Sequence, residues 1–285
     1  MTTKLNGEGT TFLPFNRETV NPTIEGDYPT AYMWRDILQA DSLLDLLLHF
    51  IKRYDESYED RNTKEMKRRT VVIFPRYHQL RAVHKLRRLV EEEGVGHNYL
   101  IQHSAGSGKT KTMAWLAHQF TNMIDANGAA VFDSIIMVTD RIVLNRNMAE
   151  DVVNFETTLG TVMDIRKRSK TLADALNGKN IIIISTVQKF AYALDYLKHE
   201  QQKRYAVIID EAHSSQSGDM ASALNKVLSG HGLKGVSMED NEEGLNTLME
   251  HVVEGRLMAK NANFYAFTAT PKNKTLQMFG DAYIK

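Results

Sequence analysis

The sequence predicts an α/β fold in which a parallel β-sheet has helices on both faces and is preceded by a short helical linker. Apolar runs recur along the chain, each short enough for a buried strand and each ending in polar residues. Helix-length segments separate these runs, as the connections of a parallel sheet require. Ligands of such sheets bind beyond the carboxyl ends of the strands, so the polar residues there are candidate site residues. The runs are residues 99–101, 134–139, 180–186, 205–210 and 263–268.

The composition limits the class of protein. With 285 residues, of which 42% are hydrophobic, the chain can bury one large core or two modest ones. It contains no cysteine, which excludes disulfides and thiolate metal sites and fits a reducing compartment. Its 35 Lys and Arg balance 35 Asp and Glu, so a nucleic-acid contact requires a local basic patch or a partner chain. The chain has no long uncharged span, and we expect a soluble, cytoplasmic protein with no membrane contact.

The first 70 residues precede the strand pattern and divide into two parts. Residues 1–30 contain three of the five prolines and little apolar periodicity, which is typical of a connector. Residues 31–70 are expected to form a helical linker, because apolar side chains recur at helical spacing in the first half. The mixed charges of residues 55–69 favour a solvated linker or exposed helix over a nucleic-acid contact. Residues 71–285 then form the domain that carries the strands.

This domain opens with a predicted helix that begins after Pro75 and ends at Glu93. Apolar residues mark one face of the helix, and a ladder of Arg and Lys marks the other. Gln79 lies near its start. A glutamine carboxamide can bond to adenine N6 and N7 at once, so Gln79 is a candidate for selecting ATP over GTP. The alternative is a glutamine at a helix start with no ligand.

Residues 103–110 read His-Ser-Ala-Gly-Ser-Gly-Lys-Thr and join the first apolar run to a helical pattern that begins at Lys109. A glycine-rich loop between a buried strand and a helix is the context of a P-loop, in which backbone N–H groups and the helix dipole bind phosphates. Lys109 can reach the β- and γ-phosphates, and the Thr110 hydroxyl can ligate Mg²⁺. A glycine turn with a surface lysine is the alternative. The predicted ATP-binding residues are Ala105, Gly106, Ser107, Gly108, Lys109 and Thr110.

Residues 206–213, Ala-Val-Ile-Ile-Asp-Glu-Ala-His, end a buried strand in two carboxylates and an imidazole. Burying Asp210 and Glu211 is costly unless a cation and a water molecule share the site. We therefore predict that Asp210 holds Mg²⁺ through water together with Thr110, and that Glu211 accepts a proton from the attacking water. His213 completes the catalytic candidates, with Lys109. A loop that merely carries charges is the alternative, which the upstream P-loop disfavours.

The last apolar run ends in Thr268-Ala-Thr-Pro271. The hydroxyls of Thr268 and Thr270 can bond to a neighbouring carboxylate or to His213, which would couple this strand to the site. A strand end followed by a proline stop is the alternative interpretation.

Taken in order, these motifs resemble the first RecA-like domain of a superfamily 2 helicase or translocase. Longer segments are similar to the motor subunit of type I restriction enzymes. They are Gln102–Thr110 running into Ala114-Trp-Leu-Ala117, Val138-Thr-Asp-Arg141, Ser185-Thr-Val-Gln188, Asp210-Glu-Ala-His-Ser-Ser-Gln216 and Phe267–Thr275, with Thr11–Asn16 and Asp41–Asp45 nearer the start.

The resemblance implies a prokaryotic, ATP- and Mg²⁺-dependent motor that moves double-stranded DNA past methyltransferase and specificity subunits until a nuclease cuts it. It also implies a nuclease domain upstream of residue 1, with residues 1–30 as its exit. A second RecA-like domain with an arginine finger would follow Lys285. We expect neither domain within these 285 residues.

DNA contacts are predicted where two strands end, at Thr139 and Arg141 and at Thr186 and Gln188. Hydroxyl, amide and guanidinium groups can hold phosphates without reading bases, which suits a motor that moves over any sequence. An internal ion pair of Arg141 is the alternative for that residue.

Two other functions remain open at this stage. Another superfamily 2 enzyme, such as an RNA helicase or a remodelling motor, would share the same ATP chemistry. A nucleotide-binding switch that does not hydrolyse ATP is the second, and Glu211 argues against it because a switch needs no general base.

Overall fold

The computed structural model describes residues 26–60, 62–139, 146–155, 162–164, 182–186, 203–210 and 260–271, and the single residues 8, 10, 15, 175 and 190. The chain divides into two compact units, residues 1–88 and residues 89–285. None of the described helices is both long and apolar enough to cross a membrane.

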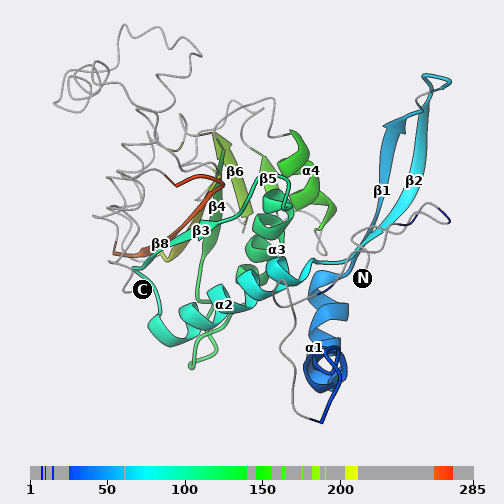
Figure 1. The fold of residues 1–285 in the computed structure, drawn as a ribbon. Helices are drawn as coiled ribbons and strands as arrows, with labels where there is room; N and C mark the ends of the chain where they lie inside the picture. The colour runs from blue at the N-terminus through cyan, green and yellow to red at the C-terminus, as the bar shows by residue number, and fades with distance from the viewer. Residues whose placement is uncertain are drawn as a thin grey trace, which may run out of the picture. The chain divides into compact units, whose positions relative to one another are not determined.

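The second unit contains a six-stranded parallel sheet with the strand order β3-β8-β7-β4-β6-β5 (Figure 1). Every residue of β4, β6 and β8 is buried, because both sheet faces are covered at these strands. This confirms the predicted α/β class with a parallel sheet. The strands are β3 (Asn98–Gln102), β4 (Ser134–Thr139), β5 (Val162–Asp164), β6 (Ile182–Thr186), β7 (Tyr205–Asp210) and β8 (Ala262–Thr268).

Helix α3 (Lys109–Thr121) packs on the sheet and against α4 (Arg146–Asn154). Its buried residues are mostly apolar, and the ring centroid of Phe120 lies 4.9 Å from that of Tyr265 on β8. The contact with α4 combines Trp115 on Phe155, at 5.3 Å between ring centroids, with a 2.5 Å ion pair of Lys111 and Asp151. The connections that follow β6 and β7 lie mostly outside the described residues, so the prediction of helices on both faces remains a prediction.

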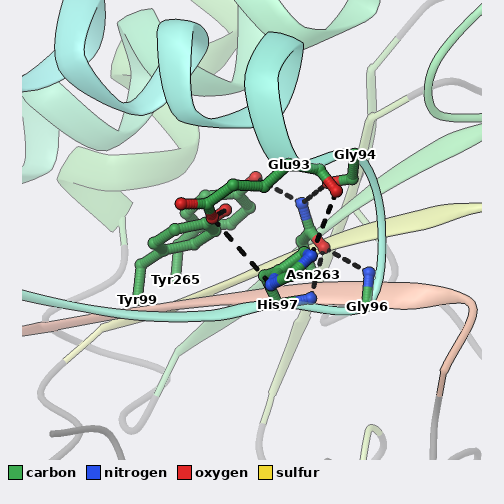
Figure 2. Close-up of polar contacts among 7 residues, drawn as sticks. All are labelled: Glu93, Gly94, Gly96, His97, Tyr99, Asn263 and Tyr265. Atoms are coloured by element: carbon green, nitrogen blue, oxygen red, sulfur yellow. Dashed lines mark hydrogen bonds and ion pairs between the residues drawn. The ribbon is translucent and has the colours of Figure 1, made fainter. Parts of the chain in front are cut away.

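A polar cluster at the amino end of β8 fastens the turn between α2 (Tyr77–Glu93) and β3 (Figure 2). The buried Asn263 carboxamide accepts hydrogen bonds from the N–H groups of Gly96 (2.7 Å) and His97 (2.8 Å). Its amide nitrogen donates to the Gly94 carbonyl (3.0 Å) and to the Tyr265 hydroxyl (3.1 Å). One side chain therefore satisfies backbone groups that the turn would otherwise bury without partners.

Two stacked tyrosines complete this cluster. The rings of Tyr99 and Tyr265 lie 5.1 Å apart, and the Tyr99 hydroxyl donates to the Glu93 carboxylate at 2.7 Å. Burial and Glu93 raise the pKa of Tyr99, and burial raises that of Tyr265. Both hydroxyls therefore remain protonated at physiological pH.

The first unit begins with short helical segments, followed by an antiparallel pair of strands (Figure 1). Among residues 31–70, the described helical residues end at Phe50 and strands follow, so the predicted helical linker over residues 31–70 is wrong beyond that point. Residues 1–30 were predicted as a connector, and most of them lie outside the described part of the chain. The elements are the π-helical turns η1 (Met33–Ile37) and η2 (Leu46–Phe50), α1 (Ala40–Asp45), β1 (Lys52–Glu59) and β2 (Met66–Ile73).

Cross-strand pairs explain why a charged segment forms strands instead of a helix. Exposure alternates residue by residue along β1. Glu56 and Arg69 are direct partners joined at 2.6 Å, and the Arg69 guanidinium also lies 4.6 Å from the Tyr58 ring centroid. On the other face, the Thr70 hydroxyl donates to Asp55 at 2.7 Å. Opposite charges that face each other on the two strands stabilise the pairing of β1 with β2. The number of charged residues in the segment does not indicate which of them will face each other.

Candidate ATP-binding site

The glycine-rich loop begins where β3 ends and leads directly into α3. The N–H of His103 donates to the carbonyl of Thr268 at 2.9 Å, which fixes the start of the loop to the end of β8. Gly106 and Gly108 have φ angles of +75° and +84°, in the left-handed region that favours glycine. A Cβ on Gly106 would meet no atom within 4 Å, so backbone conformation, not crowding, requires glycine there.

Lys109 and Asp210 meet across the end of β8. Strands β3 and β7 both pair with β8, so the residues that follow β3 and end β7 lie on either side of Thr268. The distance from Lys109 Nζ to Asp210 Oδ1 is 3.3 Å, and only 12% and 17% of the two side chains are exposed. Thr110 follows in the first turn of α3 and is partly exposed. A cation and a carboxylate therefore lie together at the carboxyl edge of the sheet, and Thr110 follows the cation directly in the chain.

Thr268 lies at this edge with its side chain fully buried. Its hydroxyl oxygen has no hydrogen-bond partner among the described residues. Burying an unpaired hydroxyl is costly, which favours a polar partner at this point. Phosphate oxygens and the water ligands of Mg²⁺ are partners of this kind, so the residues present fit a bound Mg·ATP. Thr270 is exposed two residues further on.

Gln79 belongs to the first unit, where it lies near the start of α2. Its side chain is 3% exposed, and its Oε1 accepts a hydrogen bond from the N–H of Arg76 at 2.8 Å. A side chain in the first helical turn that bonds back to this N–H is half of a capping box. Gln79 thus has a capping role at the helix start, and its contact with adenine stays a prediction.

The two threonines predicted to contact DNA are buried. Thr139 and Thr186 are direct partners of β4 and β6 at the carboxyl edge, with exposures of 0% and 5%. The Thr139 hydroxyl lies 3.4 Å from the Ser185 carbonyl, to which it donates within the sheet. Both hydroxyls are therefore little exposed in this structure, and their contact with DNA phosphates stays a prediction.

The other predicted site residues, Glu211, His213, Arg141 and Gln188, lie outside the described residues. The sequence analysis also missed Lys111, which follows the loop and pairs with Asp151 on α4. No signal in the sequence links these two residues, because an ion pair between separate helices depends on how the helices pack.

Comparison with known families identifies the class of ATPase. Residues 78–236, which include the glycine-rich loop and Asp210, match the family described as SWI2/SNF2 ATPase. The chain belongs to the SWI2/SNF2 ATPase family. Nucleotide binding is the property that membership in this ATPase family implies, and the loop, Lys109 and Asp210 are the residues of this member that fit it.

Curated relatives of this SWI2/SNF2 ATPase are named as endonuclease subunits of type I restriction enzymes. One from Methanocaldococcus jannaschii is 26% identical over 73% of this chain, and one from Staphylococcus aureus (strain MSSA476) is 34% identical over 53%. The matches span only 22% and 16% of the lengths of those two relatives. Among solved structures, the Hef helicase domain of Pyrococcus furiosus aligns over 73% of this chain and 37% of its own, with 15% identity and a TM-score of 0.45.

Proposed function

We propose that this chain is the ATP-hydrolysing part of a motor that translocates double-stranded DNA. It would act within the restriction subunit of a type I restriction-modification complex, beside methyltransferase and specificity subunits. Membership in the SWI2/SNF2 ATPase family and the names of the curated relatives support the proposal. The single observation that carries the ATPase part is the pairing of Lys109 with Asp210 beside the glycine-rich loop.

Each residue has a defined task in the proposed reaction. The loop from Ala105 to Gly108 would hold the phosphates through backbone N–H groups, and Lys109 would neutralise charge on the β- and γ-phosphates. Thr110, and Asp210 through water, would hold Mg²⁺, which supplies electrostatic stabilisation of the transferred phosphoryl group. The carboxylate Asp210 also holds the Lys109 ammonium at the sheet edge.

Glu211 is the proposed general base. Its carboxylate would accept the proton of the attacking water, and His213 would bond to the hydroxyls of Thr268 or Thr270. The hydroxyl of Thr268 is buried beside the paired Lys109 and Asp210, which supports its role as the residue that couples β8 to the site.

A steady-state ATPase assay tests the proposal. We expect the chain alone to hydrolyse ATP very slowly, because an arginine finger from a second RecA-like domain is worth about a thousandfold or more in related reactions. A longer protein that includes this chain should show turnover stimulated by duplex DNA and not by RNA. Stimulation by RNA would indicate an RNA helicase instead, and nucleotide binding without turnover in the longer protein would indicate a switch.

A further inference from the structure

Helix α2 carries an uninterrupted basic segment. Within the helix, residues 77–90 contain four Arg and Lys and no Asp or Glu, ahead of the acidic last turn at residues 91–93, in a chain whose formal net charge is zero. Positions 81, 85 and 88 are spaced by four and three residues, so Arg81, Lys85 and Arg88 share one face of the helix, and all three are exposed. This face is a local basic patch of the kind that a chain with no net charge needs for contact with a polyanion.

The same three residues line a pocket of about 580 Å³ within the first unit. Its lining residues come from α2 and from the helical segments between residues 36 and 46, and they include the apolar side chains of Leu46 and Leu80. Asp36 is the one carboxylate among the described lining residues. We call this pocket and its three cations the α2 groove.

The carboxylate of Asp45, close to the groove, already has hydrogen-bond and ion-pair partners other than the groove cations. It accepts hydrogen bonds from His84 at 2.7 Å and from His49 at 2.8 Å, and it lies 3.7 Å from Arg87. Within the described part of the chain, Arg81 and Lys85 form no ion pair. The positive charge of Arg81 and Lys85 therefore remains available to a ligand.

We propose that the α2 groove binds phosphates of double-stranded DNA, as a contact separate from the ATP-binding edge of the sheet. The proposal rests on the proposed function of a DNA motor. Arg81 and Arg88 are seven residues apart, or about 10 Å along the helix axis. This span matches about three phosphates of one strand, given a spacing of about 3.4 Å per phosphate along the duplex.

The chemistry of the groove favours a phosphate backbone over bases. Guanidinium groups present paired donors that fit phosphate oxygens, and lysine adds a mobile charge. No Asn or Gln is present among the described lining residues to read an adenine edge. Binding should therefore be independent of DNA sequence, as a translocating motor requires.

Titration of a fluorescent duplex of mixed sequence, about 30 base pairs long, into the full chain at several salt concentrations tests the proposal by anisotropy. We expect Arg81→Gln/Lys85→Gln/Arg88→Gln to weaken binding about tenfold or more and to reduce the salt slope by about 2 to 3, because each phosphate contact contributes about 0.9. The matched control is Arg53→Gln/Lys64→Gln/Arg68→Gln, which removes the same charge from the exposed strand pair β1–β2. The control should bind within about twofold of the wild type.

The outcomes separate this proposal from the proposed function. If the wild type binds duplex and both triple variants bind alike, the groove proposal is wrong, and an acidic protein surface becomes the better ligand for these cations. If the wild type does not bind duplex, and DNA does not stimulate the ATPase of the longer protein, the motor function fails first. If circular dichroism shows that the groove triple variant does not fold, the single change Lys85→Gln at an exposed position is measured instead. A salt slope of DNA binding reduced by about 1 supports the groove proposal, and an unchanged salt slope overturns it.

Discussion

The Lys109 ammonium lies 3.3 Å from the Asp210 carboxylate, although 101 positions of sequence separate the two residues. The pair closes across the end of β8, which lies between β3 and β7 in the sheet. A lysine and a carboxylate with little exposure each lose hydration, and their mutual attraction offsets that cost. Proximity to the glycine-rich loop and to the buried Thr268 hydroxyl makes this pair the centre of the proposed nucleotide site.

Replacing Lys109 with Ala should abolish ATP hydrolysis in a longer protein that includes this chain. The change removes the charge that would stabilise the β- and γ-phosphates, and it leaves Asp210 without its cation. We expect turnover to fall by at least a hundredfold, or about 2.7 kcal/mol of transition-state stabilisation, in a coupled phosphate-release assay. Lys64→Ala, which changes an exposed lysine of the β1–β2 turn, is the control and should retain full activity. Normal turnover by the Lys109 variant would rule out the P-loop assignment.

Replacing Glu211 with Gln should separate binding from hydrolysis. The variant keeps the size and hydrogen bonding of the side chain but cannot accept a proton, so only the transition state is destabilised. Nucleotide affinity, measured with a fluorescent ATP analogue, should stay within about threefold of the wild type while hydrolysis stops. An equal loss of affinity and turnover would make Glu211 a binding or structural residue.

Replacing Asn263 with Ala should destabilise the second unit by about 3 kcal/mol. The change leaves the N–H groups of Gly96 and His97 and the carbonyl of Gly94 without their partner inside a buried turn. Chemical denaturation followed by circular dichroism should show a lower midpoint, whereas exposed Asn62→Ala should not shift it. A loss below about 0.5 kcal/mol would mean that water replaces the carboxamide at little cost.

Asp45 should make the stability of the first unit depend on pH. Burial pushes the pKa of Asp45 upward, but the hydrogen bonds from His84 and His49 outweigh it and hold this pKa below the ordinary carboxyl value. Because the pKa of Asp45 is lower in the folded protein than its unfolded value of 3.8, the ionised carboxylate stabilises the folded state at pH values above 3.8. This contribution is lost as the pH falls through the folded-state pKa. The difference in unfolding free energy between wild type and Asp45→Asn should therefore be present above about pH 4 and shrink as the pH falls below it. A difference that is constant with pH, or equal to that of exposed Asp41→Asn, would contradict this account.

Local pattern was enough to predict the sheet and the start of the site. Strands β4 and β7 occupy the predicted ranges, and α3 begins at the predicted Lys109. Short continuous apolar runs that end in polar residues favour strands of a sheet that is covered on both faces. The positive φ angles of Gly106 and Gly108 likewise follow from a residue type that alone tolerates them easily.

The tertiary structure decided what depends on pairing between distant residues. The strand pair β1–β2 places Glu56 opposite Arg69, where their ion pair stabilises it, and the composition of that segment indicated only mixed charge. The burial of Thr139 and Thr186 depends on the layers beside β4 and β6, which sequence spacing cannot show. The contact between Lys109 and Asp210 depends on strand order. The sequence determined that Lys109 follows one strand and that Asp210 ends another, and only the folded sheet places β8 between those two strands. Local backbone preference acts within a few residues, whereas strand order reflects the packing free energy of the whole sheet.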